Sequence, residues 1–187
     1  AWSERLPIVL AINTAGVMLQ FWAAWRTLMA MRHARVQAAV KTSRWMRILI
    51  GVMLLSMAIK IAAQSVVSIP MVATMALTLR NYVIGFIHLN TLGSISALLF
   101  AHALMRGWFD ERQLPVRAGL LLFIIGYACS ELLLFGQGTL FWFGAGLLPG
   151  YYWALFSASV LLPVGVGLLL VASLRKKPAP TVDVDAG

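Results

Sequence analysis

Five apolar runs of membrane length follow one another along the chain, separated by short polar connectors. At about 1.5 Å of rise per residue, about 20 apolar residues cross a hydrocarbon core about 30 Å thick. Each run is therefore predicted to form a transmembrane helix. The predicted spans cover about residues 6–31, 48–69, 81–105, 118–135 and 151–174. This pattern predicts an all-α fold, a polytopic bundle of transmembrane helices in which residues 1–175 form a single domain.

The segments between the runs differ in length and charge. Residues 32–47 carry dense basic charge, which predicts an amphipathic segment on the inner membrane surface. The segment Met71–Arg80 is too short to cross a membrane and is predicted to be a loop or an interfacial turn. Arg106–Arg117 is predicted to be an exposed loop, and residues 136–150 a Gly- and aromatic-rich link at the interface. Residues 176–187 are predicted to form a disordered polar tail.

The basic residues of the connectors lie almost entirely on one side of the predicted bundle. That side holds Arg32, Arg35, Lys41, Arg44, Arg47, Arg106, Arg112, Arg117, Arg175, Lys176 and Lys177, whereas the other holds Arg5 and Arg80. Cytoplasmic segments carry the excess of Lys and Arg in membrane proteins. The distribution therefore predicts an N-terminus outside and a C-terminus inside.

Composition supports a membrane protein and excludes other classes. The chain is 61% hydrophobic and 11% charged, whereas soluble domains are about 25% charged. A net charge of +9 would suggest nucleic acid in a soluble protein, but here the basic residues flank apolar runs and suit lipid headgroups. We expect the lipid bilayer as a partner, no nucleic acid, and a bacterial inner membrane as the location. Cys129 is the only cysteine, so an intrachain disulfide and a thiolate metal cluster are excluded.

His88 lies about two turns into the third predicted span. An ionisable ring at that depth is costly, and such residues commonly mark functional sites. Its imidazole could bind haem iron or another metal, or it could hydrogen-bond to a neighbouring helix. Gly85 and Gly93 on the same span allow a close approach to the backbone, either by another helix or by a flat macrocycle.

Lys60 and Glu131 are the charged side chains that lie well inside the apolar runs. A charge in lipid must be paired, neutralised or hydrated. The two residues could form a structural ion pair or a proton relay. Together with Gln64, one turn after Lys60, they could also line the polar path of a transporter or channel.

One stretch resembles a known family. The segment from Gln64 through Pro70 to YVIGFIHLNTLG (Tyr82–Gly93) resembles subunit I of the haem–copper oxidases, most closely the cbb-type oxidases and nitric-oxide reductases. The similarity covers about thirty residues. The predicted helix count and orientation agree with that family, whose histidine-bearing helix also enters from outside and precedes two more spans.

The resemblance implies a b-type haem, with His88 at the position of the axial ligand of the low-spin haem. Phe86 stands where the family has the histidine ligand of the oxygen-reducing haem, and histidines for copper are absent from the sequence. The resemblance therefore implies electron transfer or gas sensing without an oxygen-reducing centre, and we expect no copper and no catalysis by the chain on its own. It also implies that these are the C-terminal helices of a longer protein, packed against its other helices or partner subunits. A transporter or channel segment and a purely structural membrane subunit are the alternatives.

Overall fold

The computed structural model describes residues 2–37 and 43–174, and within these ranges every regular element is a helix and there is no strand. The elements are α1 (Trp2–Gln37), α2 (Arg44–Val67), α3 (Pro70–Thr78), α4 (Arg80–His88), the π-helix η1 (Leu89–Ser96), α5 (Ala97–Met105), α6 (Leu114–Trp142) and α7 (Tyr151–Leu174). The predicted polar tail, and Lys41 in the basic connector, lie outside the described residues.

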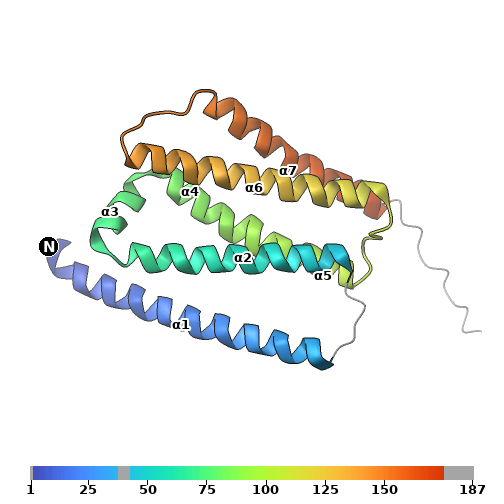
Figure 1. Ribbon diagram of the computed structural model, residues 1–187, viewed down its shortest axis with the longest axis horizontal. Helices are drawn as coiled ribbons and strands as arrows, with labels where there is room; N and C mark the ends of the chain where they lie inside the picture. Colours follow the sequence, from blue (N-terminus) through green and yellow to red (C-terminus); the bar gives the residue numbers. More distant parts are fainter. Residues whose placement is uncertain (1, 38–42, 175–187) are drawn as a thin grey trace, which may run out of the picture.

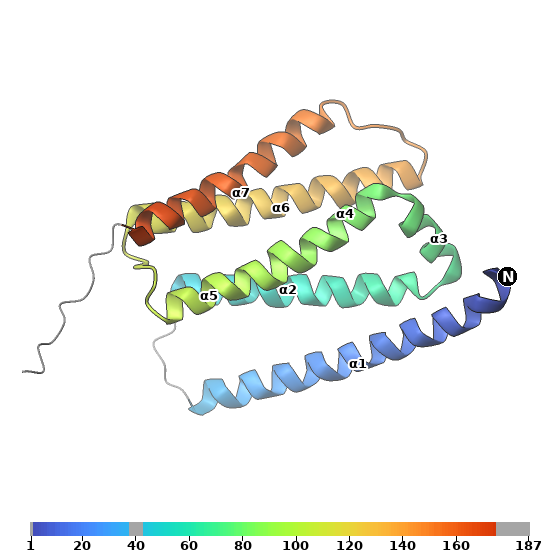
Figure 2. The same cartoon turned by 180° about the vertical axis from the view of Figure 1, so that it is seen from behind.

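The long helices lie side by side and alternate in direction, as Figures 1 and 2 show from opposite sides. α4, η1 and α5 continue one another as a single rod, Arg80–Met105. In the described part of the chain, four helices are long and apolar enough to cross a membrane: Arg44–Val67, Arg80–Met105, Leu114–Trp142 and Tyr151–Leu174. The prediction of an all-helical, multi-pass architecture is confirmed to that extent.

Three stretches differ from the prediction. The first is the start of α6, which begins at Leu114 inside the segment Arg106–Arg117 that was expected to be an exposed loop. The segment expected to be a loop or turn after the second span forms the helix α3, which Pro70 begins at a position where its missing N–H is not needed. The fourth span does not end near Phe135 but continues to Trp142. Within this continued part of α6, Gly138 packs against the ring of Tyr82, where an added Cβ would lie 3.0 Å from a ring carbon.

The side chain of Gln137 on α6 makes hydrogen bonds to residues 146 and 148 in the link between α6 and α7. Its Nε2 donates to the carbonyl of Gly146 at 2.9 Å, and its Oε1 accepts from the N–H of Leu148 at 2.9 Å. The amide is buried and occupied at both ends. One side chain therefore satisfies two backbone groups of the link between α6 and α7, which are outside any helix.

α6 and α7 pack through small residues spaced seven apart. Gly119 and Gly126 on α6 face Gly165 and Ala158 on α7, and these four residues are buried. A Cβ added to Gly119 would lie 2.7 Å from the carbonyl oxygen of Gly165, and one added to Gly126 would lie 2.9 Å from that of Ala158. Small residues let helix backbones approach closely in a membrane, where water does not drive helices together.

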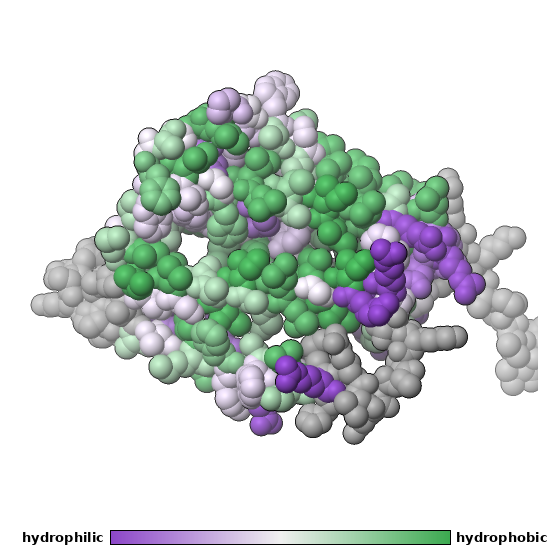
Figure 3. All heavy atoms as spheres, in the orientation of Figure 1, coloured by the Kyte–Doolittle hydropathy of each residue, from purple (hydrophilic) through white to green (hydrophobic). Residues whose placement is uncertain are grey.

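The charged residues gather at one end of the bundle, where Figure 3 shows the hydrophilic surface. Arg106 and Arg112 are exposed in the loop after α5, and Arg44 and Arg47 are exposed at the start of α2. These elements share an end because α2, α5, α6 and α7 meet there in one apolar cluster. Arg80 lies at the opposite end. The described residues thus carry the charge asymmetry on which the orientation prediction depends.

Candidate intramembrane ionisable site

His88 and Glu131 face each other from two neighbouring helices. His88 is the last residue of α4, and Glu131 lies near the middle of α6. The His88 Nδ1 lies 3.8 Å from the Glu131 Oε1, and the two side chains are 33% and 10% exposed. The sequence placed both residues at a similar depth in the membrane, and the structure brings them into contact.

Both polar ends of this pair lack other partners. The two carboxylate oxygens of Glu131 and the Nδ1 of His88 are buried, and none has a hydrogen bond within the described residues. The distance of 3.8 Å exceeds that of a hydrogen bond, so the two atoms would need to approach by roughly 1 Å to share a proton. Buried polar groups are normally satisfied, and exceptions of this kind are typical of functional positions.

The helix changes its hydrogen-bonding pattern directly after His88. Leu89–Ser96 is π-helical, and hydroxyl groups inside it bond back to carbonyls, with Ser96 Oγ donating to Thr91 O at 3.0 Å. π-helical turns are rare and are found frequently at functional sites. The wider turn begins at Leu89, the residue that follows the contact with Glu131.

A second contact across the bundle lies beside the pair. The hydroxyl groups of Ser56 on α2 and Tyr127 on α6 are 2.7 Å apart in a buried hydrogen bond. This bond packs against Gly93 of η1, where an added Cβ would clash with both hydroxyl groups. Tyr127 is one turn before Glu131, so the two contacts form one polar layer that joins α2, α4, η1 and α6.

Lys60 and Gln64 follow Ser56 at intervals of four residues, so all three lie on one face of α2. The structure pairs Glu131 with His88 rather than with Lys60, for which the described residues provide no ion pair. Gln64 lines a cavity at the α3 end of the bundle, and its buried Oε1 lacks a hydrogen bond among the described residues. The polar path expected along Lys60, Gln64 and Glu131 stays a prediction, and the contact that the structure shows for Glu131 is with His88.

The surroundings of His88 do not fit a haem in this arrangement. The space before Gly85 holds the ring of Phe135, with an added Cβ 3.1 Å from a ring carbon, and the space before Gly93 holds Tyr127 and Ser56. These contacts are those of helix packing. The large cavity is lined by Phe86 and Ile87, and His88 is not among its lining residues.

Other potential ligands also lie elsewhere. In the described ranges there is no group of three or more His, Cys, Asp or Glu side chains that could hold a metal ion. His102 is exposed on α5, and its Nε2 accepts a hydrogen bond from Arg106 Nε at 3.4 Å. Haem binding at His88 therefore stays a prediction.

Comparisons add no relative to this picture: the chain matches no family model, no curated protein and no solved structure at a significant level. The site therefore depends on its own geometry. Sequence reasoning missed Ser56 and Tyr127, although the position of Tyr127 four residues before Glu131 was a usable signal. It also missed the partner of Glu131, because hydropathy predicts depth in the membrane but not the rotation of each helix.

Proposed function

We propose that this protein is a proton-translocating membrane protein in which His88 and Glu131 bind and release the moving proton. We infer five spans, with α1 as the fifth, an N-terminus outside, a C-terminus inside and a bacterial inner membrane as the location. The observation that carries the proposal is the contact at 3.8 Å between an imidazole and a carboxyl group whose facing atoms have no other partner in the described part of the chain.

The chemistry of the two groups suits this role. An ionisable residue inside a membrane span faces the bundle interior and commonly marks an ion or proton path. When the proton moves from the carboxylic acid of Glu131 to the neutral imidazole of His88, a neutral pair becomes an ion pair. Each group then serves as the partner of the other. Lys60 and Gln64 extend the polar face of α2 toward the α3 end, which is the outer end in the inferred orientation.

Purified protein reconstituted into vesicles tests the proposal. A potassium diffusion potential drives protons, and a dye inside the vesicles reports the internal pH. We expect a proton flux above that of protein-free vesicles, and we expect Glu131→Gln to reduce it to the protein-free rate. Glu111→Gln is the matched control, because the same change in the loop before α6 leaves the intramembrane pair intact. An equal flux in Glu131→Gln and in the unchanged protein would refute the proposal.

A haem-binding function is the second candidate. It would require the helices around His88 to move apart, because Phe135, Tyr127 and Ser56 fill the space before Gly85 and Gly93, but one observation favours it. Histidines that bind a metal through one nitrogen commonly present the other to a carboxylate, as His88 Nδ1 is presented to Glu131. If haem binds, the haem-supplemented protein shows a b-type reduced-minus-oxidised spectrum that His88→Gln removes and His102→Gln preserves. Absence of a Soret band would refute this function and leave the proton flux as a separate question.

A further inference from the structure

A cavity of about 510 Å³ lies between α1, α2, α3, α4 and α6, at the α3 end of the bundle. In the space-filling view of Figure 3 the surface is hollowed on the side where α3 lies. Cavities of about 300–1,000 Å³ are typical of small-molecule sites. The size therefore suits a molecule of a few fused rings, and the position inside a bundle of apolar helices suits one that is soluble in lipid.

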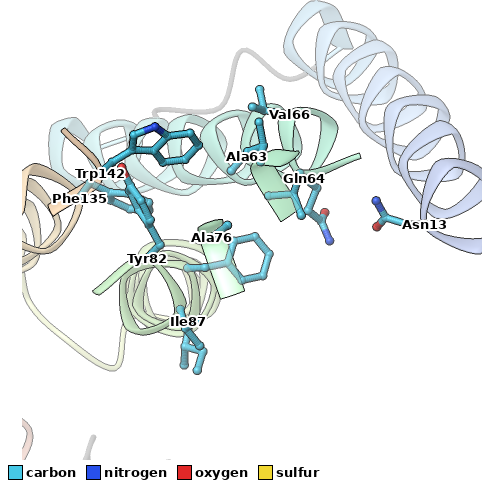
Figure 4. Close-up of a pocket in the computed structure, with 13 residues that line it drawn as sticks. Asn13, Ala63, Gln64, Val66, Ala76, Tyr82, Ile87, Phe135 and Trp142 are labelled. Carbon is cyan, nitrogen blue, oxygen red and sulfur yellow. The ribbon is translucent and has the colours of Figure 1, made fainter. Parts of the chain in front are cut away.

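One wall of the cavity is aromatic. The ring of Tyr82 lies 6.1 Å from that of Phe135 and 6.2 Å from that of Trp142, and Phe86 also lines the space. Figure 4 shows Tyr82, Phe135 and Trp142 grouped on one side of the cavity. Aromatic rings pair favourably with other rings in stacked or edge-to-face contacts. This wall favours a planar aromatic ligand over a flexible acyl chain.

The opposite side of the cavity presents a polar group. The amide ends of Gln64 on α2 and Asn13 on α1 point toward each other there, as Figure 4 shows. The Asn13 Nδ2 donates to Ser68 Oγ at 3.0 Å, whereas the Gln64 Oε1 is buried and lacks a donor among the described residues. A buried carbonyl oxygen without a donor is unfavourable, so a ligand that brings a hydroxyl group to it is favoured over one that does not.

We propose that this cavity binds a lipid-soluble aromatic alcohol, with its ring against the aromatic wall and its hydroxyl group donating to Gln64 Oε1. The site is separate from the proton-binding pair, because neither His88 nor Glu131 lines the cavity. A lipid acyl chain is the competing occupant. It would fill the apolar space but leave the Gln64 carbonyl unpaired.

Binding of 2-naphthol to the full chain in lipid nanodiscs tests the inference. 2-Methylnaphthalene has nearly the same shape without the hydroxyl donor, and protein-free nanodiscs correct for partition into lipid. Equilibrium dialysis should show saturable uptake of 2-naphthol, one per chain, and affinity about tenfold lower for 2-methylnaphthalene. Gln64→Leu should abolish this difference between the two probes by weakening only 2-naphthol.

Substitutions at two neighbouring alanines test whether the probes bind in this cavity. Ala63 lines this cavity, whereas Ala62 lies on a different face of α2, beside a second hollow against α1. Ala63→Phe should weaken both probes, and Ala62→Phe should change neither. If Ala63→Phe does not insert, Gln64→Leu decides the question. Uptake equal to that of protein-free nanodiscs, or equal affinity for both probes in the unchanged protein, would overturn the inference and favour a lipid chain.

Discussion

Replacing Gly93 with alanine should destabilise the centre of the bundle. Gly93 is buried in η1, at the point where Ser56 and Tyr127 form their hydrogen bond. The added Cβ would clash with both hydroxyl groups and would lie 2.6 Å from the Tyr127 Cζ. Relief requires a shift of α2 or α6, because the ring of Tyr127 is held between helices.

The expected cost follows from three terms. Overpacking of a filled interior costs about 1–3 kcal/mol. Loss of a buried hydrogen bond costs about 1–3 kcal/mol when a polar group stays unpaired. Alanine is favoured over glycine in a helix by about 1 kcal/mol, which offsets part of the loss. We therefore expect Gly93→Ala to lower the free energy of unfolding by about 1–5 kcal/mol, with a central value of about 3 kcal/mol.

Equilibrium unfolding in mixed detergent micelles, followed by circular dichroism, measures this free energy. Gly136→Ala on α6 is the matched control, because an added Cβ there meets nothing within 4 Å. That change should be neutral or stabilise by up to about 1 kcal/mol. In a Tyr127→Phe background the cost of Gly93→Ala should shrink by about 1 kcal/mol, since the hydrogen bond is already lost. If Gly93→Ala is as well tolerated as Gly136→Ala, the packing described around η1 is wrong.

Three further outcomes are expected. Gly165→Ala should destabilise the protein by about 1–3 kcal/mol, because α6 lies against that Cα, whereas Gly167→Ala should not; equal unfolding curves would contradict this. Gln137→Leu should make the α6–α7 link more susceptible to proteolysis, because two hydrogen bonds are lost; unchanged cleavage would count against the assigned role. Cysteines introduced at Lys41 and Lys176 should react with a membrane-impermeant reagent from the same side; labelling from opposite sides would refute the five-span topology.

The spans could be predicted because length and hydropathy alone determine which segments cross a membrane. The same criteria misplaced the end of α6, since the glycines at 136 and 138 suggested a link. In the structure, Gly138 is instead where the ring of Tyr82 packs. Local composition cannot distinguish a glycine that ends a helix from one that another helix contacts. The seven-residue spacing of Gly119 and Gly126, repeated by Ala158 and Gly165, was a readable signal for the α6–α7 contact.

The candidate site was partly predictable for a related reason. His88 and Glu131 stand out because ionisable side chains are rare in apolar runs, and their depths follow from the span boundaries. Their contact depends on how α4 and α6 are rotated about their axes. A helix that is apolar on every face does not reveal this rotation in its sequence. The π-helical stretch after His88 also changes which residues of this span share a face, so a count at the α-helical period does not predict them. The sequence suggested Lys60 as the partner of Glu131, and only the three-dimensional arrangement shows that His88 faces it instead.

Infrared difference spectroscopy tests the proton-exchanging pair most directly. Spectra of the protein in lipid films, recorded across a pH change, contain the C=O stretch of any carboxylic acid that gains or loses a proton. We predict one such band that disappears in Glu131→Gln and changes frequency in His88→Gln, because the imidazole faces the carboxyl group at 3.8 Å. A spectrum that is the same with and without Glu131, or a Glu131 band that does not respond to His88→Gln, would contradict the account.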